Sequence, residues 1–281
     1  MTEEGFSSEA ELLRILTLLT ISVKDAKLFL QVDFINPLCY IYHMLGALIN
    51  LLYPALCRVC SKRINDFNRN ICGDCAKKIK ERLPPFCAKC GRQLKGEPEL
   101  MDTCPDCKKD MPYFDRAWSA YHYDDPLKSL IHDFKYKKIT SLSTDFTDLI
   151  INFMKKYNIG RDCQLILSIP MHPDRLFKRE INHSDILARN LGKRMGIPCS
   201  GNTLKKTKNT LLQSKLKRGA RIKNLHLSFS LKDSSGVRNK NILLVDDIFT
   251  TGSTVNECSR LLKNSGARRV EIITLARGDN A

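Results

Sequence analysis

Two adjacent carboxylates, Asp246 and Asp247, stand directly before a short run of hydroxyl residues and glycine, in the stretch VDDIFTTGST. Gly252 permits a tight turn, and the backbone N–H groups around it would point inward together with the hydroxyls. A loop of this kind at the start of a helix binds phosphate, because exposed amides and the helix dipole favour negative charge. The residues expected to form this phosphate cup are Thr250, Thr251, Gly252, Ser253 and Thr254.

The two acids suit the other end of the same ligand. A carboxylate accepts hydrogen bonds from a sugar diol, and in a ribose 5-phosphate the diol and the phosphate lie at opposite ends. The stretch lacks the glycine and lysine spacing of a Walker loop. The alternative is a simple helix N-cap preceded by two solvated aspartates. The complete order of apolar strand, two acids and T-T-G-S-T favours a phosphosugar site.

Eight of the twelve cysteines form four C-x-x-C pairs, and each pair can present two thiolates to one tetrahedral Zn²⁺. We expect two structural zinc sites built from consecutive pairs, although interleaved pairs would also suit the spacing. Redox dithiols are the weaker alternative, since they rarely occur four at a time. Eight cysteine ligands leave no coordination position open for catalysis at zinc. The expected ligands are Cys57, Cys60, Cys72 and Cys75 for one ion and Cys87, Cys90, Cys104 and Cys107 for the other.

Basic residues outnumber acidic ones by 46 to 30, a formal charge of +16 that predicts affinity for polyanions. The densest basic segment, residues 204–224, holds eight Lys or Arg and no acid. A solvated basic face is the ordinary explanation for such a run, and contact with pyrophosphate or a nucleic-acid backbone is the alternative. The segment lacks the aromatic residues that stack on single-stranded bases. Residues considered for pyrophosphate or DNA contact are Lys135, Arg175, Arg179, Lys215 and Arg218.

Strand and helix patterns alternate after the cysteine pairs, which predicts an α/β fold with a mostly parallel sheet. Ligands of such sheets bind outside the carboxyl ends of the strands. VDDIFTTGST has that position, between an expected strand at 241–245 and an expected helix at 253–264. The other expected strands cover 117–123, 165–169 and 270–275, and the other expected helices cover 127–134, 145–157 and 184–195.

Composition divides the chain into three parts: an apolar helical extension over 1–56, a cysteine-rich module over 57–111 and an α/β domain over 112–281. In the extension, Pro37 and Pro54 leave only 16 residues between them. About 20 apolar residues are needed to cross a bilayer, so we expect no transmembrane span. A helix packed on the cysteine module is favoured over an interfacial or partner-binding helix.

The first residues also lack the basic start and small-residue cleavage site of a signal peptide. Closely paired thiols in a lysine-rich chain are typical of a metal-binding protein in a reducing compartment. We therefore expect a cytoplasmic protein, associated at most with the inner face of the membrane.

Taken together, residues 53–277 resemble the ComF competence-protein family, in which a double zinc ribbon precedes a type I phosphoribosyltransferase-like domain. VDDIFTTGST resembles the phosphoribosyl-pyrophosphate (PRPP) signature of that domain, and the closing Leu275-Ala276-Arg277 also matches. One departure follows the Pro-rich loop at 170–179. Family members usually read R-G-F-N-Q there, whereas this chain has Arg179-Glu180-Ile181-Asn182-His183.

The resemblance implies that PRPP binds with Mg²⁺, with Asp246 and Asp247 on the ribose. It also implies a role in natural transformation, in handling single-stranded DNA that crosses the inner membrane beside a helicase-like ATPase and a membrane channel. One alternative is an active phosphoribosyltransferase that moves ribose 5-phosphate to a nucleobase-like acceptor. Another is a zinc-ribbon regulator that senses a nucleotide. No acceptor pocket is evident from the sequence, so the catalytic residues stay unassigned and enzymatic activity stays open.

Overall fold

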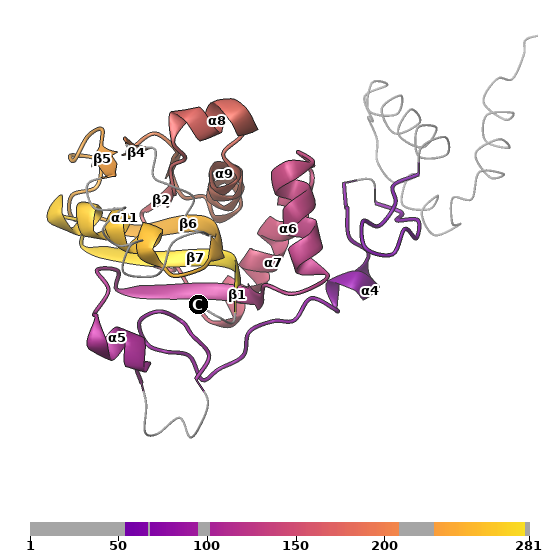
Figure 1. The fold of residues 1–281 in the computed structure, drawn as a ribbon, viewed down its shortest axis with the longest axis horizontal. Coiled ribbons are helices and arrows are strands. Elements are labelled where there is room, and N and C mark those ends of the chain that lie inside the picture. Colours follow the sequence, from indigo (N-terminus) through magenta and orange to yellow (C-terminus); the bar gives the residue numbers. More distant parts are fainter. Residues whose placement is uncertain (1–53, 67, 95–101, 208–227, 279–281) are drawn as a thin grey trace, which may run out of the picture. The chain divides into compact units, whose positions relative to one another are not determined.

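The computed structural model describes residues 54–66, 68–94, 102–207 and 228–278 (Figure 1). The chain divides into two compact units, residues 1–54 and 55–281. Almost all described residues belong to the second unit, which contains both cysteine-rich segments and the sheet. The expected helical extension and its membrane or partner contacts lie outside the described residues. Within the described part of the chain, no helix combines the length and apolarity needed to cross a bilayer.

A five-stranded sheet forms the centre of the second unit, and every neighbouring pair of its strands is parallel. The apolar run Ile242–Val245 lies in the middle strand and is buried, as expected for a parallel strand covered on both faces. The prediction of a mostly parallel sheet is therefore confirmed. In spatial order the strands are β1 (Arg116–His122), β7 (Arg269–Arg277), β6 (Asn241–Phe249), β2 (Leu165–Ser168) and β3 (Cys199–Ser200).

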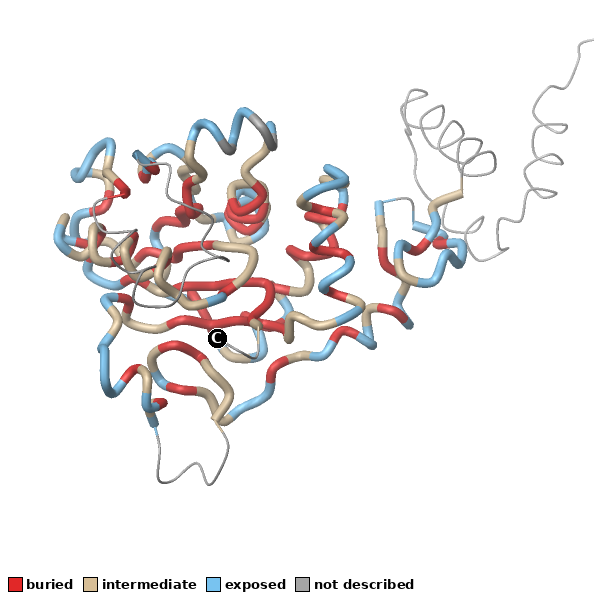
Figure 2. The backbone as a smooth tube through the Cα atoms, in the orientation of Figure 1, coloured by how far each residue is buried: buried red, intermediate tan, exposed pale blue. Residues whose placement is uncertain are grey.

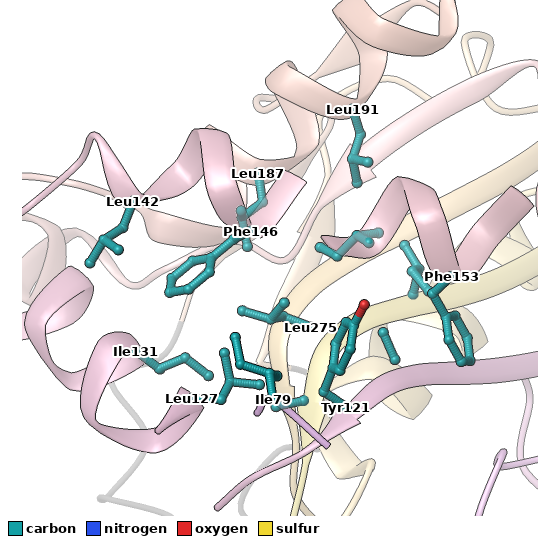
Figure 3. Close-up of a cluster of buried hydrophobic side chains, with 14 of the residues drawn as sticks. Ile79, Tyr121, Leu127, Ile131, Leu142, Phe146, Phe153, Leu187, Leu191 and Leu275 are labelled. Carbon is teal, nitrogen blue, oxygen red and sulfur yellow. The ribbon is translucent and has the colours of Figure 1, made fainter. Parts of the chain in front are cut away.

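Alternate residues of β6 contribute to two different apolar clusters, one on each face of the sheet. Leu243 and Val245 pack with α6 (Leu127–Tyr136), α7 (Leu142–Lys156) and α9 (His183–Met195). Figure 3 shows part of this cluster, in which side chains from α7 and α9 meet Leu275 of β7.

The residues between them, Ile242 and Leu244, pack on the other face with α11 (Ser253–Asn264). The strands consequently form the buried centre of the unit, as the burial colours of Figure 2 show. The two-residue periodicity of a strand explains this division, because successive side chains point to opposite faces.

Several short elements complete the described unit. The sequence patterns missed α8 because it is only two turns long, and missed the antiparallel pair β4–β5 because each strand has three residues. Segments this short carry too few positions for a hydrophobic period to be read. The short elements of the described unit are α4 (Gly73–Ala76), α5 (Pro105–Lys109), α8 (Pro173–Arg179), β4 (Leu204–Lys206) and β5 (Phe229–Leu231).

Strand β6 continues past its expected end at residue 245 and ends at Phe249. Its extension stays paired with β7, where Asp246 lies opposite Thr274 and Phe249 lies opposite Arg277. Because the extension begins with two charged residues, its sequence does not look like a buried strand. The two acids therefore lie within the strand, and only the residues after Phe249 form the loop.

Candidate functional site

The two acids of β6 are held by side chains from both neighbouring helices. Asp247 Oδ2 lies 2.8 Å from Lys135 Nζ, near the end of α6. Asp246 Oδ1 accepts hydrogen bonds from Ser184 Oγ at 2.7 Å and from the backbone N–H of Asp247 at 2.9 Å. The carboxyl half of β6, the end of α6 and the start of α9 thus meet at these carboxylates.

Burial and charge act in opposite directions on these groups. Burial, with a further contribution from the charge of Asp247, raises the pKa of Asp246 to about 7, against the Ser184 hydrogen bond and the charge of Lys135. Burial acts to lower the pKa of Lys135, but the charge and hydrogen bond of Asp247 raise that pKa overall. The single ammonium group of Lys135 therefore balances the charge of two carboxyl groups. The ionisation of Asp246 near neutral pH depends on the charge of what binds beside it.

The predicted phosphate cup lies between β6 and α11. Gly252 has φ of +74°, and a Cβ at this position would lie 2.5 Å from Cζ of the Phe249 ring, so a side chain here is excluded on both counts. Gly252 is the N-cap of α11 and offers no side-chain oxygen, which leaves the amides of the first turn suited to an anion. Thr251 Oγ1 and Ser253 Oγ lie 2.9 Å apart, so two hydroxyls face the same turn.

The structure brings some of the predicted site residues together and leaves others undescribed. Lys135 pairs with Asp247, whereas the contact predicted for it was with pyrophosphate or DNA, and that contact stays a prediction. Arg175 and Arg179 lie in α8, directly after β2, but their side chains fall outside the described part of the structure. Lys215 and Arg218 lie wholly outside the described residues. Sequence analysis missed Ser184, which is 62 positions from Asp246 and belongs to no motif.

The eight cysteines gather in two tetrads, and within each tetrad all four sulfur atoms lie within 4.8 Å of one another. Members of each tetrad come from consecutive C-x-x-C pairs, which confirms that arrangement over an interleaved one. Backbone N–H groups donate to sulfur in both: Cys72 to Cys57 Sγ at 3.4 Å and Cys104 to Cys87 Sγ at 3.3 Å. We call them the first tetrad (Cys57, Cys60, Cys72, Cys75) and the second tetrad (Cys87, Cys90, Cys104, Cys107).

Both tetrads fit a structural Zn²⁺, because four thiolates at this mutual distance form the tetrahedral cage that zinc prefers. A dication would stabilise the thiolate form of all four.

The tetrads contact different parts of the unit. Beside the first tetrad, the backbone N–H and Nδ2 of Asn70 each donate to Asp145 Oδ2 of α7 at 3.0 Å. Beside the second, the carbonyl of Lys89 accepts from the backbone N–H of Ala117 in β1 at 2.7 Å. The first tetrad therefore rests on a helix, and the second rests on the edge strand of the sheet.

Two family models match the chain: a double zinc ribbon domain over residues 48–108 and a phosphoribosyl transferase domain over residues 186–281. With the parallel sheet and the two tetrads, they define a double zinc ribbon joined to a type I phosphoribosyltransferase-like fold. Solved structures are more distant: PRPP synthetase from Mycobacterium smegmatis aligns with 18% identity and a TM-score of 0.31, over 48% of this chain and 34% of that chain. The fold assignment consequently depends on the topology and the family models.

Named relatives identify the family. Competence protein F of Haemophilus influenzae is 32% identical over 178 residues, 62% of this chain and 78% of that protein. The DNA utilization protein YhgH of Salmonella typhi is 30% identical over 65% of this chain and 80% of that protein. Competence protein ComFC of Streptococcus pneumoniae is 29% identical over 64% of this chain and 77% of that protein. The chain belongs to the ComF family of competence proteins, and the resemblance inferred from its motifs is confirmed.

Proposed function

We propose that the protein binds PRPP with Mg²⁺ at the carboxyl end of β6 and handles single-stranded DNA during natural transformation. The observation that carries this proposal is the juxtaposition of a partly buried acid pair with a helix start whose backbone conformation favours glycine. Each half suits one end of the same phosphosugar. The phosphoribosyl transferase match over 186–281 and relatives named for competence and DNA utilization support the two halves of the proposal.

In this proposal the 5-phosphate binds to the cup, and the ribose hydroxyls face Asp246 and Asp247. The ion pair between Lys135 and Asp247 keeps one carboxylate ionised and orients it. Bound Mg²⁺ would supply positive charge to the pyrophosphate, and oxygen donors are the ligands that it prefers. Ser184 fixes the rotamer of Asp246 through its hydrogen bond. The cup residues are Thr250, Thr251, Gly252, Ser253 and Thr254.

For DNA, we propose a surface formed by α6 and α8. Tyr136 at the end of α6 is 59% exposed, and Phe177 in α8 is 89% exposed. Lys138 Nζ pairs with Glu180 Oε1 at 2.7 Å, which links the ends of these two helices. Exposed rings beside lysines are what single-strand binders use for base stacking and phosphate contact.

The PRPP site is tested by calorimetry on the full chain with PRPP and Mg²⁺. We expect saturable binding that is lost when Asp246→Ala and Asp247→Ala are combined, while circular dichroism stays native. Asp162→Ala removes an exposed acid before β2 and serves as the control. Unchanged affinity in the double variant would remove the site from β6.

An active phosphoribosyltransferase is the second candidate, and the match to a phosphoribosyl transferase domain is what favours it. Such an enzyme releases pyrophosphate when the acceptor is added, because ribose 5-phosphate leaves PRPP for the acceptor nitrogen. Pyrophosphate release measured with a panel of nucleobases separates the two candidates. Release that requires both a base and the two acids would establish the enzyme. The helicase-like ATPase and membrane channel stay predictions from the family resemblance.

A further inference from the structure

Arg277, the last residue of β7, points its guanidinium at a ligand of the second tetrad. Nη1 donates a hydrogen bond to the carbonyl of Cys90, and Nη2 lies 3.8 Å from Cys90 Sγ. The residue is only 2% exposed. A buried guanidinium requires fixed partners, because removing its charge from water is costly. Arg277 is therefore tied to the geometry of Cys90.

The opposite side of the same guanidinium covers an aromatic ring of the neighbouring strand. Arg277 Cζ lies 4.3 Å from the centroid of Phe249, the residue paired with it across β6 and β7. A planar guanidinium stacks on a ring while its edge donates hydrogen bonds, which an ammonium group cannot do. Phe249 is 3% exposed, and Phe114 meets it edge-on at 6.3 Å between centroids. The ring is thereby held from two sides.

The edge of the Phe249 ring faces the turn of the phosphate cup. A Cβ on Gly252 would lie 2.5 Å from Cζ and 2.9 Å from Cε1 of that ring, so the Gly252 backbone rests directly on it. Buried atoms in such close packing transmit displacement, since no void absorbs it. A continuous line of contacts thus joins Cys90, Arg277, Phe249 and Gly252.

The first tetrad contacts a different part of the unit from the second tetrad. Its neighbour Asn70 is bonded to Asp145 of α7, a helix on the face of the sheet opposite α11. The hydrogen bonds beside this tetrad lead to α7, and within the described residues no contact given above links it to the Gly252 turn. The two zinc sites are consequently unequal with respect to the phosphate cup.

We propose that the second zinc site positions the phosphate cup through Arg277 and Phe249, and that zinc loading there sets the affinity for the 5-phosphate of PRPP. Arg277 is a positioning residue in this scheme and touches no ligand. The proposal rests on PRPP binding at β6, as proposed above. It predicts that thiol oxidation or zinc loss at the second tetrad weakens PRPP binding even while the sheet stays folded.

The substitution Arg277→Lys keeps the charge but removes both the stacking and the forked hydrogen bonds. We expect the Kd for PRPP to rise about tenfold, with two zinc ions per chain retained. Arg116→Lys is the matched control, because Arg116 also stacks on an aromatic ring, with Cζ 3.9 Å from the Trp118 centroid, but lies in β1. Its Kd should change less than twofold. Equal Kd values for Arg277→Lys and the native chain would overturn the proposal.

Phe249→Leu tests the contact between the ring and the Gly252 turn. This variant should also raise the Kd for PRPP, and it replaces Arg277→Lys if that variant does not fold. The zinc ligands are compared with Cys107→Ser and Cys75→Ser, each of which removes one ligand from one tetrad. Metal analysis should show one zinc lost in both, and PRPP affinity should fall further in Cys107→Ser. A larger loss in Cys75→Ser would contradict the assignment to the second tetrad.

Hydrogen exchange provides a readout that needs no PRPP. The Asn256 amide, which donates to the Gly252 carbonyl at 2.8 Å at the start of α11, should exchange faster in Arg277→Lys than in the native chain, whereas the amides of α7 should not change. If the native chain fails to bind PRPP but this difference is present, the coupling stands and the proposed ligand is wrong. If PRPP binds and the Asn256 amide exchanges equally in both, the coupling is wrong and the ligand stands.

Discussion

Asp246 is the residue on which the chemistry of the site depends most. It is held by Ser184 and by its neighbour's backbone N–H, and burial raises its pKa to about 7. A carboxyl with that pKa is half protonated in the cell's pH range, so ligand binding and proton release are linked. The charge of Lys135 offsets part of the repulsion between the two carboxylates. Its direct ion pair is with Asp247, so the pKa of Asp246 stays raised.

The affinity for PRPP should therefore rise with pH. A protonated Asp246 cannot accept two hydrogen bonds from a diol, and a pKa near 7 makes the ionised fraction increase about tenfold between pH 6 and pH 8. Calorimetry across this range should show about that gain in affinity, beyond the change due to the phosphates of PRPP itself. In Asp246→Asn the extra dependence should vanish, and its persistence would assign the titration to another group.

The same pKa has a consequence for stability without ligand. Because the folded chain binds the Asp246 proton more tightly than the unfolded chain, this group's contribution is complete below about pH 4 and is lost as pH rises through about 7. Chemical unfolding of the native chain and of Asp246→Asn should diverge over this interval. A native chain whose stability changes with pH in parallel with the variant would contradict the raised pKa.

At the scale of elements, the C-terminal end of α8 has a backbone conformation that its residue type does not favour. Its C-cap, Glu180, has φ of +64°, in the left-handed region that favours glycine. The R-G-F-N-Q pattern given above for the resemblance has glycine at this position. An L-residue with a Cβ pays about 1–2 kcal/mol for this conformation. The ion pair to Lys138 is exposed on both sides and offsets little of this cost.

Glu180→Gly should stabilise the folded chain by about 0.5–1 kcal/mol, because the relief of the backbone exceeds the loss of an exposed ion pair. Urea unfolding monitored by circular dichroism measures the difference. Glu180→Ala is the matched control, since it removes the same ion pair but keeps a Cβ, and it should be neutral or slightly destabilising. Equal effects of the two substitutions would mean that the backbone conformation is not strained.

The whole molecule combines a formal charge of +16 with exposed aromatic side chains in α6 and α8, Tyr136 and Phe177. The cysteine-rich segment, 57–111, contributes little to this charge once eight thiolates and two Zn²⁺ are counted. The excess therefore lies mainly in the phosphoribosyltransferase-like domain. Charge should govern the salt dependence of DNA binding, and ring stacking should add affinity that salt does not change.

Binding to a labelled single strand should weaken with salt, with a slope of log affinity against log salt near −0.7 for each phosphate contacted. Combining Tyr136→Ala and Phe177→Ala should lower the affinity by about 1–3 kcal/mol per base unstacked and leave the slope unchanged. Tyr113→Ala, which removes an exposed ring before β1, is the control. A slope that becomes shallower in the double variant would indicate lost phosphate contacts instead of lost stacking.

Features confined to a few consecutive residues were predictable from the sequence. The predicted helix 253–264 matches α11 residue for residue, because a glycine N-cap and an amphipathic run mark it locally. The four C-x-x-C pairs predicted two zinc sites for the same reason, and the structure groups their cysteines accordingly. The acid pair and the phosphate cup are likewise marked by adjacent residues, and their ligand stays a prediction. In each case the residues that act together are neighbours in the chain, so their spacing carries the information.

Only the tertiary structure decided which distant residues meet. Ser184 and Lys135 reach the acids from two helices, and Arg277 reaches Cys90 across 187 positions. No spacing rule relates such residues, because their contact depends on the order of strands in the sheet and on which face each helix covers. The local motifs could therefore be read from the sequence, whereas the line of contacts from Cys90 through Arg277 and Phe249 to Gly252 forms only after the strands have paired.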